Sequence, residues 1–92
     1  MDFKVDVKIE GDILDSLWLV VQVLNNTRDE AFLDVVPMTS RDVHVNREAS
    51  WDEQNDDIKA EVLEVASGER EGKMLAGKIK GRLMGRGYKI LP

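Results

Sequence analysis

The chain has 92 residues, no cysteine, and 18 acidic against 13 basic side chains, which gives a formal net charge of -5. This length predicts one domain, residues 1–92, built around a single core. The absence of cysteine excludes disulfides, thiolate zinc sites and thiol nucleophiles. The first residues do not resemble a signal peptide, and no apolar run is long enough to span a bilayer. We therefore expect a soluble, cytoplasmic protein, or one domain of a longer one.

The charges are unevenly distributed along the chain. Residues 73–92 contain six basic and no acidic side chains, a local charge of +6, so residues 1–72 carry -11. Such asymmetry indicates either an interaction face or two halves that attract each other within the fold.

Residues 2–10 alternate apolar and charged side chains without interruption. The apolar members of this segment are Phe3, Val5, Val7 and Ile9. A period of two is typical of a half-buried strand whose charged side faces water. The pair Gly11-Asp12 predicts a turn after this strand.

The longest apolar run spans residues 17–24, is interrupted only by Gln22, and ends at Asn25-Asn26-Thr27. Its β-branched residues predict a strand from about 16 to 25, buried on both faces. A helix over 12–26 is the alternative, but it would leave Leu19 and Val23 on its outer side. A small domain has nothing to cover a second apolar face of a helix, so we favour the strand.

Residues 31–36 predict a short strand that stops at Pro37. Together with the preceding run they indicate a hairpin over 17–36, whose loop has about five or six residues. Residues 43–45 form a further short alternating segment. The stretch 46–57 is a polar loop with one large apolar side chain, Trp51, and its residues Ser50-Trp51-Asp52-Glu53 also match a helix capping box.

The apolar pattern of residues 58–65 shifts phase near Val62. A β-bulge in a strand explains this shift, and a helix explains it as well. Residues 67–72 predict a loop. The last short strand is expected over 88–91.

Residues 73–85 fit two structures, because Leu75, Ile79 and Leu83 lie four apart. The glycines favour a strand, since each costs a helix interior about 1 kcal/mol relative to alanine. Six of them fall within twenty residues: Gly68, Gly72, Gly77, Gly81, Gly85 and Gly87. In a strand, the basic residues of this segment would share one face.

Seven candidate strands predict an all-β fold, an antiparallel immunoglobulin-like β-sandwich. The segment 21–27 resembles the second strand of such domains. Gly11 and the segment 87–90 are similar to the carboxy-terminal sandwich domains of transglutaminases, a resemblance that implies a scaffold and transfers no functional residue. The alternative fold is α+β, with a βαββαβ-like order and helices near 12–26 and 69–85.

No constellation of residues indicates catalysis, a cofactor or a metal site. His44 is the only histidine, and its place between Val43 and Val45 predicts a solvent-facing side chain. No Gly-x-Ser-x-Gly motif is present. Four carboxylates crowd the polar loop, where weak Ca²⁺ binding is less expected than a solvated loop. These are Asp52, Glu53, Asp56 and Asp57.

The basic carboxy-terminal segment is the predicted partner-binding surface. Its members are Lys78, Lys80, Arg82, Arg86 and Lys89. Basic rows bind phosphates, but the acidic remainder of the chain and a single nearby aromatic, Tyr88, argue against nucleic acid. An edge strand kept soluble by its cations is the other interpretation.

We predict a non-catalytic protein-protein interaction module that presents a strand edge or a charged face to another protein. The alternative function is a small acidic α+β regulator or inhibitor from a mobile element, which mimics nucleic acid.

Overall fold

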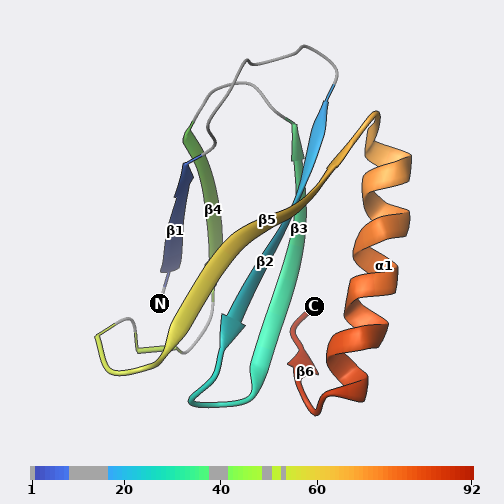
Figure 1. Cartoon of the computed structure of the whole chain (residues 1–92). Coiled ribbons are helices and arrows are strands. Elements are labelled where there is room, and N and C mark those ends of the chain that lie inside the picture. Colours follow the sequence, from blue (N-terminus) through green and yellow to red (C-terminus); the bar gives the residue numbers. More distant parts are fainter. Residues whose placement is uncertain (1, 9–16, 38–41, 49–50, 53) are drawn as a thin grey trace.

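The computed structural model describes residues 2–8, 17–37, 42–48, 51–52 and 54–92. Its main element is a four-stranded sheet with the order β5-β2-β3-β6 (Figure 1). These strands are β2 (Trp18–Asn25), β3 (Glu30–Pro37), β5 (Ile58–Ala66) and β6 (Lys89–Ile90). A second sheet is an antiparallel ribbon of β1 (Asp2–Lys8) and β4 (Asp42–Glu48). One helix, α1 (Glu69–Gly85), packs on the main sheet.

The fold is a small α+β arrangement, and the predicted seven-strand β-sandwich is wrong. Figure 1 shows α1 on one side of the main sheet and the β1-β4 ribbon on the other. The sheet is mixed, because β2 pairs antiparallel with β3 and β5, whereas β6 runs parallel to β3. The α+β alternative correctly placed a helix over 69–85. Its second helix, near 12–26, is wrong, since the described part of that range is the strand β2.

Strand β2 is the centre of the core, as its apolar run predicts. On the side of the sheet away from α1, Leu19, Val21 and Val23 are buried with an exposed fraction of 0%. On the other face, Val20 and Leu24 pack against the buried side of α1. A strand that is apolar on both faces requires a layer on each side of it, which this fold supplies.

The predicted β2-β3 hairpin is confirmed, with a loop shorter than expected. Asn25 pairs with Glu30 and Trp18 pairs with Pro37, so only residues 26–29 form the loop. Pro37 is the last residue of β3, at the edge of the sheet, where its missing N–H is tolerated.

Strand β5 contains the predicted β-bulge. Val20 of β2 pairs with Glu64, but the next residue, Val21, pairs with Val62. Leu63 is therefore the extra residue, and it packs against the cluster that α1 buries on the sheet. The phase shift in the sequence is thus explained by a bulge, and the helical interpretation of 58–65 is wrong.

Residues 73–85 are helical, so the predicted strand is wrong. The predicted loop over 67–72 is also shorter, because α1 begins at Glu69. The buried side of α1 consists of residues three or four apart, as in any amphipathic helix. They are Gly72, Ala76, Ile79 and Leu83.

The glycines of α1 are compatible with a helix because of where they lie. A Cβ atom on Gly72 would stand 2.6 Å from Cγ1 of Val35, so this position needs glycine for close packing against β3. Gly77 and Gly81 face open space and contribute nothing to packing. They lower the helix propensity, but the apolar side buried on the sheet outweighs that cost.

The last glycine of the segment ends the helix. Gly87 has a φ of 95° and its N–H donates to the Met84 carbonyl at 3.1 Å. The Tyr88 N–H donates to the Leu83 carbonyl, also at 3.1 Å. These two bonds form a Schellman motif, in which glycine supplies the left-handed residue. The motif turns the chain back into β6, where the predicted last strand is confirmed.

Several expectations concern the remaining segments. The strand over 2–10 is confirmed for Asp2–Lys8, and residues 9–12, including the expected turn, lie outside the described part of the chain. Residues 46–48 belong to β4 and not to a loop. Ser50 and Glu53 of the expected capping box also lie outside the described residues. Within the described residues, no helix is long and apolar enough to cross a membrane.

Candidate partner-binding surface

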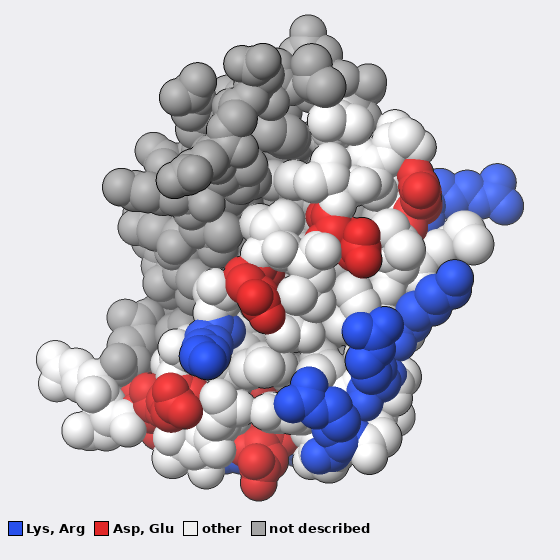
Figure 2. All heavy atoms as spheres, viewed as in Figure 1, with Lys and Arg blue, Asp and Glu red and all other residues white. Residues whose placement is uncertain are grey.

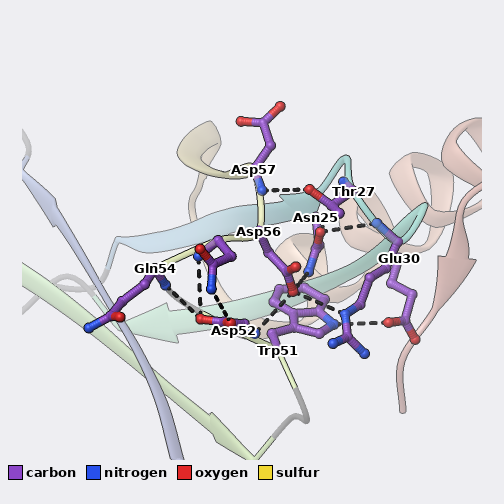
Figure 3. A network of polar contacts seen from close by, with 10 residues as sticks. Asn25, Thr27, Glu30, Trp51, Asp52, Gln54, Asp56 and Asp57 are labelled. Atoms are coloured by element: carbon purple, nitrogen blue, oxygen red, sulfur yellow. Dashed lines mark hydrogen bonds and ion pairs between the residues drawn. The ribbon is translucent and has the colours of Figure 1, made fainter.

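A polar network fastens the β2-β3 turn to the segment that precedes β5 (Figure 3). Its centre is Asn25, whose exposed fraction is 0%. The Asn25 amide donates to Oδ2 of Asp56 at 2.9 Å. Its Oδ1 accepts the N–H groups of Thr27 and Arg28 at 3.1 and 3.2 Å. A buried amide with all these partners is a structural element, because leaving it unpaired would cost about 1–3 kcal/mol.

Asp56 is the second member of this network. Its Oδ2 also accepts Nε of Arg28 and the N–H of Asp52, both at 3.0 Å. The hydrogen bond from Asn25, followed by that from the Asp52 N–H and the charge of Arg28, lowers the pKa of Asp56. The Asn55 amide and the Gln54 N–H likewise lower the pKa of Asp52.

The described carboxylates of this loop are therefore hydrogen-bond acceptors within the fold. No three of the described acidic or histidine residues are grouped so that they could hold a metal ion. Glu53 lies outside the described residues, as do the side-chain surroundings of His44. These hydrogen bonds give Asp52 and Asp56 a structural role in the described part of the loop.

Acid should weaken the fold through Asp56. The pKa of Asp56 is lower in the folded chain than its ordinary value, so its stabilising effect is present at neutral pH. It is lost as the pH falls through the folded-state pKa, because protonation removes an acceptor of three hydrogen bonds. We expect the melting temperature to decrease once the pH is lowered below about 4. Asp56→Asn should lower the melting temperature at pH 7 and make the acid dependence shallower. Circular dichroism melts between pH 7 and pH 3 measure both effects. If the melting temperature of Asp56→Asn fell with pH as steeply as that of the parent chain, Asp56 would not be the group responsible.

Trp51 anchors the same loop, a role that the sequence did not reveal. Its ring is 1% exposed and packs against Phe32 with ring centroids 5.6 Å apart. Its Nε1 donates to Oε1 of Glu30 at 3.0 Å. The only signal in the sequence is a single large apolar side chain within an otherwise polar stretch.

The predicted basic surface is divided by the helix. Lys78 and Arg82 lie one turn apart on one flank of α1, whereas Lys80 lies about 200° of rotation away from Lys78 on the opposite flank. Arg86 follows the helix, and its guanidinium lies 5.6 Å from the centre of the Tyr88 ring. Lys89 belongs to β6. A strand would have placed the first four on one face, so that part of the prediction is wrong.

Within the described part of the chain, most cations of α1 form no ion pair. Among the described residues, ion pairs join only Lys73 to Glu69, at 2.8 Å, and Arg28 to Asp56, at 3.0 Å. The exposed side chains of Lys78, Lys80 and Arg82 form none within that part of the chain. Figure 2 shows Lys and Arg side chains gathered over α1, beside separate Asp and Glu side chains that follow the diagonal direction of β5.

Two methionines are also exposed on α1. Met74 is 61% and Met84 is 63% exposed, although both are large apolar side chains. Met74 lies one turn from Lys78, and Met84 lies one turn from Lys80. The outer side of α1 thus combines free cations with accessible apolar surface. We call this set, Met74, Lys78, Lys80, Arg82 and Met84, the outer surface of α1.

The function of this surface has to be argued from its chemistry. Known proteins give no information on the resemblance to transglutaminase domains or on the activity. Protein-family models, curated proteins and solved structures were compared with the chain, and none of them matches it.

Proposed function

We propose that the protein is a non-catalytic binding module and that the outer surface of α1 binds an acidic surface of another protein. The observation that carries this proposal is the group of three exposed cations, Lys78, Lys80 and Arg82, without an acidic partner among the described residues. Charges that are not used within the fold are available to steer and orient a partner.

The exposed methionines favour a protein over a nucleic acid. Methionine and arginine are enriched in protein interfaces, and methionine adapts its shape to the surface it meets. Binding of single-stranded nucleic acid relies on free aromatic rings, which stack on bases. Tyr88 is the aromatic residue nearest this surface in sequence, but its hydroxyl donates to Asn26 and its ring is beside Arg86.

The neighbouring strand also disfavours a polyanion. Glu61 and Glu64 of β5 are exposed and pair with residues of β2 that contribute to the α1 side of the sheet. A nucleic acid lying across α1 would pass close to these carboxylates and be repelled. A protein partner places its acidic groups only where the cations are, so it avoids this repulsion.

Charge reversal of one flank tests the proposal. In the double variant Lys78→Glu/Arg82→Glu, capture of the partner from an extract of the native host should fall by about tenfold or more, because attraction becomes repulsion. The melting temperature should change little, since both side chains are exposed and unpaired in the described structure. Capture on the immobilised protein, measured by quantitative mass spectrometry, gives the readout.

The matched control is Lys59→Glu, which reverses an exposed lysine on β5 that does not belong to the outer surface of α1. It should leave capture unchanged. Equal capture by the parent and the double variant would contradict the proposal. Capture that disappears after nuclease treatment of the extract would show that the partner is a nucleic acid.

The second candidate function is a small acidic regulator or inhibitor that mimics nucleic acid. It is retained because that alternative requires an α+β fold, which this chain has. It is less favoured because several carboxylates are already occupied within the fold. Asp52 and Asp56 accept backbone and side-chain donors, and Glu71 accepts the N–H and hydroxyl of Ser67. A cytoplasmic location remains a prediction from the sequence.

A further inference from the structure

The outer edge of β3 is paired over only part of its length. β2 pairs with all eight residues of β3, from Glu30 to Pro37. On the other edge, β6 pairs with Glu30 and Ala31 only. Among the described strands, none pairs with β3 beyond that point, so residues 32–37 form an open edge of the main sheet.

The orientation of the peptide groups along this edge follows from the bond to β6. The Ala31 carbonyl accepts the Leu91 N–H at 2.8 Å and therefore points outward. Peptide groups alternate along a strand, so those of Leu33 and Val35 point outward as well. The Val35 N–H donates to Oδ1 of Asp34, its own neighbour, at 3.0 Å. This local bond covers one edge donor and can be exchanged for a bond to another chain.

A groove of about 390 Å³ lies beside this edge, between β3 and α1. Its wall on the sheet is formed by three residues of β3, and its wall on the helix by four residues of α1. These are Leu33, Asp34, Val35, Lys73, Ala76, Gly77 and Lys80. Gly77 adds no side chain to the helix wall, and nothing lies within 4 Å of the place where its Cβ would be.

The groove has a cation at each end. Lys73 and Lys80 are seven residues apart on α1, which corresponds to two turns and about 10 Å along the helix. Lys73 pairs with Glu69 at 2.8 Å, but the Lys73 side chain is 67% exposed and the Glu69 side chain is 50% exposed. Such an exposed pair contributes little and is readily exchanged for another carboxylate.

We propose that this groove binds an extended acidic segment of a partner protein, which adds to β3 as a further strand beyond the end of β6. The Leu33 carbonyl and the Val35 N–H and carbonyl would bond to its backbone, as in other cases of strand addition. Alternate residues of the segment, about 6–7 Å apart, face α1, so carboxylates there reach Lys73 and Lys80. Residues between them face the apolar side of the sheet, next to Val36.

The charges favour this occupant over a second copy of the chain. Two copies that paired through the same edge would bring their Lys73 and Lys80 side chains together, and like charges repel. The groove shares Lys80 with the outer surface of α1, but Lys73 and the open edge of β3 belong to the groove alone. It therefore does not depend on the flank formed by Lys78 and Arg82, which is the part of the outer surface that the charge reversal above tests.

Synthetic peptides test the groove in the intact chain. A fluorescein-labelled hexapeptide of alternating valine and glutamate should bind, as measured by fluorescence anisotropy, and shift the amide resonances of Leu33 and Val35. The same peptide with N-methyl groups on alternate residues keeps its charges but cannot pair as a strand, so it should not bind. A peptide with lysine in place of glutamate should not bind either.

Variants locate the site. Lys80→Glu should weaken binding of the acidic peptide by about fivefold or more, because an attraction becomes a repulsion. Lys78→Glu makes the same change on the opposite flank of α1 and should leave binding unchanged. Equal weakening by the two variants, equal binding of the N-methylated peptide, or no binding at millimolar peptide would each overturn the proposal. Equal weakening by Lys80→Glu and Lys78→Glu would instead show that the peptide binds to the outer surface of α1.

Discussion

Trp51→Ala should lower the free energy of unfolding by about 3–5 kcal/mol, the range found when large aromatic side chains are removed from a core. Trp51 is 1% exposed and packs with Phe32, Leu19 and Val23 on the face of β2 that α1 does not cover. Its removal leaves a cavity under the sheet and also leaves Glu30 without the indole donor. Urea denaturation followed by circular dichroism measures the loss.

A conservative change separates the two contributions of this tryptophan. Trp51→Phe keeps an aromatic ring against Phe32 but lacks the N–H that donates to Glu30. It should cost clearly less than Trp51→Ala, since most of the apolar contact is kept. Small domains have a total stability of about 5–15 kcal/mol, so the alanine variant should be close to unfolding at 37 °C. A loss below about 1 kcal/mol for Trp51→Ala would show that the loop is not anchored in the core.

The strands of the main sheet could be predicted because their signals are local. The run at 17–24 is apolar on both faces and rich in β-branched residues, and only a central strand fits that pattern in a small domain. The phase shift near Val62 marked the bulge at Leu63 for the same reason. In both cases the side chains of consecutive residues reported directly on the faces of one strand.

The helix was mispredicted because the glycines were weighed by their number and not by their positions in the element. Propensity gives each glycine the same cost, but Gly72 is required for contact with Val35, and Gly87 forms the end of the helix. The spacing of Leu75, Ile79 and Leu83 was the more informative signal. Burial of an apolar side on the sheet decided the structure, as tertiary packing commonly does.

The candidate surfaces show the same division between local and long-range information. The charge of residues 73–89 is evident in the sequence, but which cations share a face depends on the period of the element. Lys78 and Lys80 share a strand face and lie on opposite flanks of a helix. The Asn25–Asp56 bond joins residues 31 apart in sequence. It follows from the pairing of β2 with β5, so no local pattern predicts it.

Alanine at three glycines of α1 should change stability in opposite directions. Gly77→Ala and Gly81→Ala should each raise the free energy of unfolding by about 0.5–1 kcal/mol, because both positions are in a helix, exposed and surrounded by open space. Gly72→Ala should lower it by about 1–2 kcal/mol, because its Cβ would stand 2.6 Å from Cγ1 of Val35 and overpacking has such costs. Val35 is β-branched and has few rotamers into which it can move.

Urea denaturation of the three variants under one condition gives a comparison with an internal control, because the chemical change is the same at each position. Gly72→Ala combined with Val35→Ala should recover part of the loss, since the smaller side chain removes the atom that the new Cβ would meet. If Gly72→Ala were as stabilising as the other two, α1 would not pack closely on β3. The groove beside β3 would then lose its helix wall, so this variant also tests the geometry on which peptide binding depends.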